Sequence, residues 1–391
     1  MSVNLIIFTS YFAVEIKDIK GGIGYRYVGL YANLIKFFLR KFTKSTIFWY
    51  SQDDSSLRVY NGRRWRKLNQ CNMTKAVTTS VISSLKSRSY LICLLGYPYA
   101  VPSIKKIWQY FLSLFTLKIF GLGGRVKLVT DFFDPPIEAA YAFSKKKPPI
   151  IFVALLRFID SLTLRLSNLI IVLNEIWEYY VSKLYKLDRS KMVIVQNGSL
   201  ICQMPQKKEI SDSFNVLYAG SAIEEKGIHK LCEVIANSRR RGFKVELYIA
   251  GAKLMELPDF VHIASYPWPE FVNNVLANTD VCVIPYPPDS FTFRYASPAK
   301  LSDYMAAGKP VISTNLFYTA KIIKKYKCGV VAKDWDEFEF YIEKLYNDRE
   351  LAKKLGENGL RASGEFNYTL LAEKLFNNLL GMFRCASHED K

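Results

Sequence analysis

Short apolar segments alternate with amphipathic helical patterns along this chain, and the alternation constrains the fold more than any other feature. In the second half, Val216–Ala219, Val245–Ala250 and Asp280–Pro285 have the length and composition of buried strands. The pattern after the first of them places Ile228 and Leu231 on one helical face. Strands separated by helices pair in parallel, because the crossover helix returns the chain to the same end of the sheet. The sequence therefore predicts an α/β fold.

The first half repeats this alternation, and the length of the chain indicates two domains. Its expected strands are Asn4–Thr9, Thr46–Tyr50, Leu91–Leu95, Val126–Val129 and Leu169–Leu173. A chain of 391 residues exceeds what one hydrophobic core usually holds. Polar and charged residues gather at Ser199–Ser213, so we expect a first domain over 1–205 and a second over 206–391. The last helix is free to pack back on the first domain.

The segment Ser297–Ser313 reads SPAKLSDYMAAGKPVIS and carries the strongest functional signal. Ser297 followed by Pro298 predicts a helix start, where unpaired backbone N–H groups favour an anion such as a diphosphate. Lys300 and Asp303 lie three residues apart on one helical face and are expected to be available to a ligand. On spacing alone, a solvent-exposed Lys and Asp pair at an ordinary helix-to-strand junction is an equal alternative.

This segment resembles the signature of glycosyltransferase family 4 and related enzymes of the GT-B fold, in which a helix with a Lys and an acidic residue precedes a Gly-Lys-Pro-Val turn. The likeness runs from about Asn215 to Leu360 and includes the helix start Glu225-Lys226-Gly227. It implies two doubly wound, Rossmann-like parallel-sheet domains that face a central cleft. It also implies transfer of a sugar from a nucleotide diphosphate sugar, with retention of configuration, to an acceptor hydroxyl bound by the first domain.

The resemblance assigns most of the donor site to the second domain. The acidic residue that binds the ribose falls on Asp303, where the family usually has Glu, and an earlier family Glu is replaced by Tyr295. Lys226 matches the family's phosphate-binding Lys, so it is also expected to stabilise the leaving diphosphate. Ser221 or Ala222 stands where the family has Arg, and Arg294 and Lys300 are the candidates to supply the missing charge. The expected donor site is Gly22, Gly220, Ser221, Lys226, Arg294, Ser297, Lys300 and Asp303.

In the first domain, the resemblance places Gly22 in a glycine loop that approaches the donor or acceptor, ahead of a helix from about Tyr25. Asp131 follows an expected strand, where an acidic residue faces the ligand cleft of α/β proteins. It is expected to orient or deprotonate the acceptor hydroxyl; the alternative is a turn residue before two prolines. A His that many relatives carry beside this position is absent. Asp134 and Glu175 are further cleft candidates.

Positive charge is concentrated in the first half of the chain. Residues 1–200 carry 29 Lys and Arg against 11 Asp and Glu, whereas residues 201–391 carry 25 against 24. The imbalance predicts an anionic partner for the first domain, either a membrane surface, a phosphorylated lipid or nucleic acid. Ile104–Phe120 has Trp108 and Phe115 at helical spacing, which suits a membrane interface as well as a buried helix. We therefore expect an anionic membrane surface and a lipid-linked acceptor glycan, and, without a nucleic-acid motif, no nucleic acid.

The remaining features concern cofactors and location. The seven cysteines are scattered and contain no CxxC pair, which favours a reducing compartment and no metal cluster. The donor sugar is a substrate, and no metal or other cofactor is expected. Met1–Thr9 enters directly into a strand, and no apolar run reaches the roughly 18 residues needed to span a bilayer. The expected location is the cytoplasm, peripherally on the inner face of the membrane.

Two other functions remain open from the sequence. One is a nucleotide-sugar epimerase of the same fold, which would keep the donor site but need no acceptor surface; the basic first domain argues against it. The other is a non-enzymatic basic protein that binds nucleic acid or a membrane, suggested by a sequence pI of about 9.4. The nearly balanced charge of the second domain argues against this reading.

Overall fold

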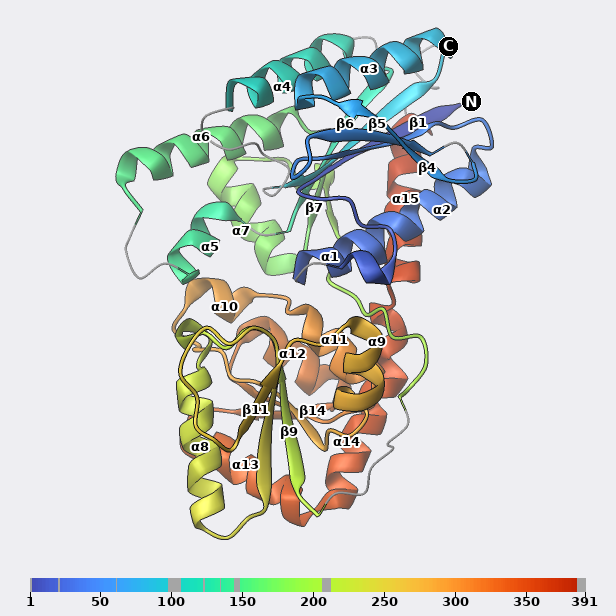
Figure 1. The fold of residues 1–391 in the computed structure, drawn as a ribbon. Helices are drawn as coiled ribbons and strands as arrows, with labels where there is room; N and C mark the ends of the chain where they lie inside the picture. Colours follow the sequence, from blue (N-terminus) through green and yellow to red (C-terminus); the bar gives the residue numbers. More distant parts are fainter. Residues whose placement is uncertain are drawn as a thin grey trace. The chain divides into compact units, whose positions relative to one another are not determined.

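The computed structural model describes residues 2–19, 22–60, 62–97, 107–121, 124–133, 135–143, 148–205 and 212–384. The chain divides into two compact units, which Figure 1 shows as ribbons. Unit 1 is Met1–Gln196 with Leu371–Lys391, and unit 2 is Asn197–Leu370.

Unit 1 is built on an eight-stranded sheet in the order β4-β3-β2-β1-β5-β6-β7-β8. Its strands are β1 Val3–Thr9, β2 Ile47–Ser51, β3 Ser56–Tyr60, β4 Trp65–Gln70, β5 Tyr90–Tyr97, β6 Val126–Phe132, β7 Leu169–Val172 and β8 Met192–Ile194. All five expected strands are present and pair in parallel, and β8 adds a further parallel strand. The sequence analysis missed β3 and β4, which form an antiparallel extension at one edge. The basic run in β4 hid a strand because an edge strand is tolerant of charged side chains.

The helices of unit 1 cover this sheet (Figure 1). They are α1 Gly22–Arg26, α2 Ala32–Lys41, α3 Met73–Lys86, α4 Ile107–Gly121, α5 Pro136–Phe143, α6 Ile150–Leu166 and α7 Glu175–Tyr185, with a π-helical turn at Tyr27–Tyr31 between the first two. The sequence analysis expected Gly22 in a loop and the helix from about Tyr25. This expectation is wrong, because Gly22 is the first residue of α1. The close approach in this region falls on Gly24, where an added Cβ would lie 2.3 Å from the Tyr11 hydroxyl.

The C-terminal helix α15, Tyr368–Arg384, packs on unit 1 from Leu371 onward. Phe376 contacts the rings of Phe37 and Phe38, and Phe383 contacts Tyr90 at a centroid distance of 5.0 Å. Lys374 Nζ donates to the carbonyl of Ile194 at 2.8 Å. These contacts explain why the end of the chain groups with its beginning.

Unit 2 contains a six-stranded, all-parallel sheet in the order β11-β10-β9-β12-β13-β14. Its strands are β9 Phe214–Ala219, β10 Val245–Ala250, β11 Val261–Ala264, β12 Val281–Ile284, β13 Val311–Thr314 and β14 Gly329–Ala332. Its helices are α8 Ile228–Arg240, α9 Trp268–Glu270, α10 Phe291–Tyr295, α11 Ala299–Ala306, α12 Phe317–Tyr326, α13 Trp335–Asn347 and α14 Arg349–Ala362; a π-helical turn, Phe271–Leu276, follows α9. Strands β9, β12 and β13 read as nearly continuous apolar runs because helices cover both faces of a parallel sheet.

The boundary between the units lies earlier than the sequence analysis placed it. The structure divides after Gln196, so the expected boundary at 205 falls inside unit 2. The reason is local pairing: Ser199 forms an isolated parallel bridge with Asn367, and its amide donates to Phe366 at 2.8 Å. Polar composition suggested a linker, but these residues are held by backbone hydrogen bonds.

Candidate functional site

The strand order of unit 2 predicts where a ligand binds. From β9 the chain continues to β10 and β11 on one side of the sheet, then crosses to β12 and β13 on the other. The carboxyl ends of β9 and β12 therefore flank a topological switch point, the usual ligand crevice of an open α/β sheet. The loops that begin at Gly220 and Pro285 leave the sheet at this point.

Glycines let these two loops approach closely. Gly227 has φ +75°, and a Cβ added to it would lie 2.1 Å from the carbonyl oxygen of Pro285. Gly220 has φ +147°, and its added Cβ would lie 3.0 Å from Lys300 Nζ. Only glycine meets both the positive φ and the short approach. The expected glycine at 220 thus borders the Lys300 ammonium.

Two lysines converge on this point from different elements. Lys226 ends a 3₁₀ turn, Glu224–Lys226, after β9, whereas Lys300 lies in the first turn of α11. Lys300 Nζ donates to the Tyr286 hydroxyl at 2.7 Å and lies 4.1 Å from the centroid of the Tyr218 ring. Two positive groups held close together attract a multivalent anion.

The electrostatics of the lysines agree with an anion site. Burial lowers the pKa of Lys300 well below its ordinary value, and the charge of Lys226 lowers it further. Burial also lowers the pKa of Lys226, with Glu225 acting in the opposite direction. Both shifts disfavour the charged forms. An anion between the two ammonium groups would offset the repulsion between Lys226 and Lys300. The site therefore favours a negatively charged ligand.

Asp303 points to a different partner. Its Oδ1 accepts a hydrogen bond from the Ser199 hydroxyl at 2.7 Å, and the residue is 6% exposed. Burial raises the pKa of Asp303 to about 7, although the Ser199 hydrogen bond lowers it. Both Lys300 and Asp303 have partners within unit 2, so the alternative of a solvent-exposed Lys and Asp pair is wrong, whereas the expected availability of the two side chains to a ligand stays a prediction. The packing reason is that most of α11 is enclosed, with Tyr304 of the same helix fully buried.

The helix start at Ser297 is also displaced from its expected position. Helix α11 begins at Ala299, and Pro298, with ψ 124°, precedes it as the capping residue without a side-chain cap. Ser297 lies ahead of the helix, where its carbonyl accepts from Asn197 Nδ2 at 2.9 Å. Pro298 itself has an extended ψ, so the capping position falls one residue later than expected.

Two further positions of the expected donor site, Ser221 and Arg294, lie in the loop after β9 and on α10. Ser221 follows Gly220 in the loop after β9 and is half-buried. Arg294 is exposed on α10, with its guanidinium 5.9 Å from the Tyr295 ring. Tyr295 itself packs against Phe291 and Phe317, at centroid distances of 5.0 and 6.0 Å. An aromatic cluster therefore occupies the place where the family has its earlier Glu.

In unit 1, Asp131 is fully buried in β6 and forms an ion pair. Arg26 Nε donates to Oδ2 at 2.7 Å and Arg26 Nη2 donates to Oδ1 at 2.8 Å. The Tyr31 hydroxyl also donates to Oδ2 at 2.8 Å. A carboxylate engaged by a bidentate arginine and a tyrosine joins α1 to the sheet, and this geometry does not favour the expected general-base role. The alternative turn role is wrong, because Asp131 lies within a strand.

The other candidates of the first domain differ in how well they are placed. Glu175 is the first residue of α7, directly after the capping residue Asn174, whose side chain accepts from two backbone amides. An acidic residue in the first turn stabilises a helix, so this position has a sufficient structural explanation. Gly22 begins α1, as described above. Asp134 lies outside the described residues.

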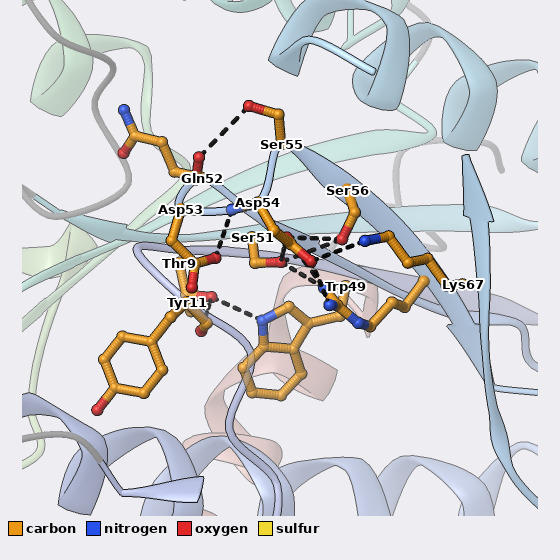
Figure 2. A network of polar contacts seen from close by, with 11 residues as sticks. Thr9, Tyr11, Trp49, Ser51, Gln52, Asp53, Asp54, Ser55, Ser56 and Lys67 are labelled. Carbon is orange, nitrogen blue, oxygen red and sulfur yellow. Dashed lines mark hydrogen bonds and ion pairs between the residues drawn. The ribbon is translucent and has the colours of Figure 1, made fainter. Parts of the chain in front are cut away.

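Sequence reasoning missed a polar network at the carboxyl ends of β1 and β2, shown in Figure 2. Asp54 accepts from the hydroxyls of Ser51 and Ser56, each at 2.7 Å, and from Lys67 Nζ at 3.1 Å. Arg58 Nη2 donates to the same carboxylate at 2.5 Å. Burial acts in the opposite direction, but these hydrogen bonds hold the pKa of Asp54 well below its usual range. The signal was present as the turn sequence DDSS after an apolar strand.

A second missed network surrounds Asp160 of α6. The hydroxyls of Tyr97 and Tyr185 both donate to this carboxylate, the latter at 2.6 Å. Burial raises the pKa of Asp160 to about 6, against the lowering effect of these hydrogen bonds. Arg157 donates to Tyr185 and to Glu138, which links the network to α5. Sequence periodicity marks such residues only as polar positions on an apolar helix.

The described residues contain no group of three or more His, Cys, Asp or Glu that could hold a metal ion. The six cysteines in that part of the chain are free thiols. None of the described helices combines the length and apolar character needed to cross a bilayer.

Two α/β units, with lysines at the switch point of the second, define the GT-B architecture that the sequence predicted. Solved glycosyltransferase structures share this fold. The structure of sucrose-phosphate synthase from Thermosynechococcus elongatus is similar over 98% of this chain and 100% of that chain, with a TM-score of 0.68 and 13% identity. HepE from Anabaena in complex with UDP is similar over 97% of this chain and 100% of that chain, with a TM-score of 0.60 and 13% identity.

Sequence comparison finds a family model that matches most of the second unit. Residues 203–362 match the family model of glycosyl transferases group 1. The capsular polysaccharide biosynthesis glycosyltransferase CapM from Staphylococcus aureus is 25% identical over 181 residues, which is 43% of this chain. The match spans 46% of CapM, so less than half of that relative is represented. The resemblance to GT-B glycosyltransferases is confirmed, while the assignment to family 4 stays a prediction.

Proposed function

We propose that this protein is a glycosyltransferase that moves a sugar from a nucleotide diphosphate sugar to an acceptor hydroxyl. The observation that carries the proposal is the position of Lys300 beside Gly220 at the switch point of unit 2, within reach of the charge of Lys226. Two partly buried ammonium groups with lowered pKa values suit a diphosphate, which carries charge on two adjacent phosphates. The match of residues 203–362 to glycosyl transferases group 1 supports the same activity.

The chemistry follows from where charge develops. As the bond between the sugar's anomeric carbon and the diphosphate breaks, negative charge grows on the leaving phosphate. Lys226 and Lys300 stabilise that charge, with the N-terminus of α11 adding backbone N–H groups. The new bond forms to the acceptor oxygen with retention of configuration, and no metal ion takes part. Asp303 holds the ribose through its second oxygen, since Ser199 occupies the first.

The acceptor side of the proposal rests on charge. Residues 1–200 carry 29 Lys and Arg against 11 Asp and Glu. This excess supports an acceptor presented at an anionic surface, a lipid-linked glycan at the inner face of a membrane. The general base is left unassigned, because Asp131 is held by Arg26 and Tyr31.

Thermal unfolding with a panel of nucleotides tests the donor site. UDP, GDP, ADP and their sugars are added to the wild type, Lys226→Ala and Lys300→Met, the second of which keeps the side-chain length. Mass action raises the melting temperature when a ligand binds only the folded state. We expect a shift with one nucleotide family that both variants lose and that the exposed-lysine control Lys353→Ala retains.

The result separates the possible activities. A wild type that shows no shift with any nucleotide contradicts the donor site. Once the nucleotide is known, incubation with its sugar and no acceptor identifies an epimerase, which would convert the donor sugar without transferring it. Transfer that appears only when an acceptor is added supports the proposal.

A further inference from the structure

Helix α4 of unit 1 exposes a stripe of large apolar side chains. Trp108, Leu112, Phe115 and Ile119 recur at spacings of four, three and four residues and therefore lie on one face. Trp108 is 58% exposed and Phe115 is 61% exposed. The opposite face of the helix packs on unit 1, with Tyr110 fully buried. The exposed stripe is thus the outer face of a well-packed helix.

The neighbouring helix α6 continues this apolar surface. Ile151 is 82% exposed and Phe158 is 60% exposed. The Phe158 ring lies 6.1 Å from the ring of Phe111 on α4, and on the buried side the Tyr110 hydroxyl contacts the Thr163 hydroxyl at 2.6 Å. The two helices lie side by side in Figure 1. We define the α4–α6 face as Trp108, Leu112, Phe115 and Ile119 with Ile151 and Phe158.

The surroundings of this face are basic and poor in accessible acid. Residues 104–167, the stretch of chain that contains α4 and α6, hold 10 Lys and Arg but 4 Asp and Glu. The three described carboxylates of that stretch, Asp131, Glu138 and Asp160, are 0%, 6% and 0% exposed. Their charges are therefore held in buried networks. Accessible charge near the face comes from basic residues such as Lys118 and Arg165.

We propose that the α4–α6 face docks on an anionic lipid bilayer, with its aromatic and aliphatic side chains in the headgroup and acyl boundary. Basic side chains around an apolar helical face gain from anionic headgroups while the apolar side chains leave water. A second copy of this chain is a poorer occupant, because two strongly basic units repel each other. The inference rests on the proposed function, which supplies the lipid-linked acceptor. The α4–α6 face would bring the protein to the membrane that contains this acceptor.

Vesicle binding tests the proposal on the whole protein. Co-sedimentation compares vesicles of phosphatidylcholine and phosphatidylglycerol with vesicles of phosphatidylcholine alone. We expect binding to the mixed vesicles that weakens with salt. Phe115→Ser is expected to weaken this binding about tenfold or more, from the transfer free energy of one phenylalanine side chain. The matched control is Phe340→Ser in unit 2, which removes a 55% exposed phenylalanine and should bind as the wild type does.

A second measurement locates the contact. Phospholipids brominated in the acyl chain are expected to quench the fluorescence of Trp108 in the bound protein. Trp108→Phe should lose most of that quenching while still sedimenting with the vesicles. Quenching that is unchanged in Trp108→Phe would place another tryptophan at the membrane and overturn the proposal.

Other outcomes would also reject it. Equal vesicle binding by Phe115→Ser and Phe340→Ser would show that the protein binds anionic vesicles through charge alone and that the apolar face does not contribute. A wild-type dimer that Phe115→Ser converts to a monomer in sedimentation velocity would make a second copy the occupant. The nucleotide-induced shift in melting temperature is measured on the same variants. If vesicle binding holds while no nucleotide binds, the proposed function fails and the docking surface stands; the reverse result rejects only the docking surface.

Discussion

At the residue scale, Lys300 illustrates how function and stability compete in this site. Its ammonium is desolvated between the rings of Tyr218 and Tyr286, at 4.1 and 4.8 Å from their centroids, and it is repelled by Lys226. The cation–π contacts offset part of this cost. A residue chosen for stability alone at this position would be apolar, since a buried charge without a counter-ion is unfavourable. Among the described residues, the printed contacts of the Lys300 ammonium are with the Tyr286 hydroxyl and the two tyrosine rings, and the anionic ligand proposed above would act as its counter-ion.

Asp303 gives a pH-dependence prediction at the same scale. Its pKa is raised from 3.8 to about 7 in the folded protein, mainly by burial. Between these values the folded state binds more protons than the unfolded state, so this residue's favourable contribution is complete below pH 4 and is lost as the pH rises to 7. The unfolding free energy should fall by up to about 1.4 kcal/mol per pH unit in this window because of Asp303. Asp303→Asn should remove that part of the slope.

Urea unfolding from pH 4 to pH 8 measures this slope. Because Asp160 also titrates in part of the range, the informative quantity is the difference between the wild type and Asp303→Asn. The exposed Asp336→Asn controls for removal of a carboxylate. Parallel stability curves for the wild type and Asp303→Asn would show that Asp303 does not titrate as its buried position requires.

At the element scale, loops and not the strands determine the geometry of the site. Strand β9 and helix α8 set the positions of the loop ends, but the path between them depends on Gly227 and its 2.1 Å approach to the carbonyl of Pro285. Gly227→Ala should therefore cost more stability than backbone strain alone, by roughly 1 to 3 kcal/mol, because the loop after β9 must move away from β12.

Gly242 provides a matched control for this prediction. It has φ +92°, but an added Cβ would meet nothing within 4 Å, so Gly242→Ala reports the strain without the collision. Urea unfolding of both variants gives the difference between the two costs. We also expect Gly227→Ala, and not Gly242→Ala, to lose the nucleotide-induced shift in melting temperature. Equal costs in the two variants would contradict the close-approach explanation.

The elements also show what the sequence could predict. Apolar runs such as Val126–Val129 and Val245–Ala250 predicted strands because burial on both faces leaves a local signal. The hairpin β3–β4 was missed because charged side chains on an edge strand carry no such signal. The ion pair of Arg26 with Asp131 was missed for a different reason: it joins residues 105 positions apart, a separation that periodicity does not reveal.

At the scale of the whole molecule, the proposed nucleotide-sugar site lies in unit 2 and the proposed membrane-binding face lies in unit 1. The sequence predicted the two-domain GT-B fold, because the fold depends on strand order and short motifs, whereas the donor role of Lys226 and Lys300 stays a prediction. It could not predict that Asp303 would bond Ser199, or where the units divide, because both depend on tertiary contacts around residues 197–199. Charge asymmetry remained informative at this scale, since residues 1–200 hold most of the net charge of +19.

This separation predicts that the two proposed ligands protect different units from hydrogen exchange. A saturating nucleotide should slow amide exchange in unit 2, at the loop after β9 and in α11, by up to about a hundredfold when it is present at 100 times its dissociation constant. Anionic vesicles should slow exchange in α4 and α6 of unit 1. Mass spectrometry of peptic fragments reads both effects in the intact protein, with Lys300→Met and Phe115→Ser as the respective controls. Because each site is built from residues of one unit, each variant should abolish one protection pattern and leave the other. Nucleotide protection confined to α4 and α6 would place the anion site in the basic unit and contradict the assignment of the donor to unit 2.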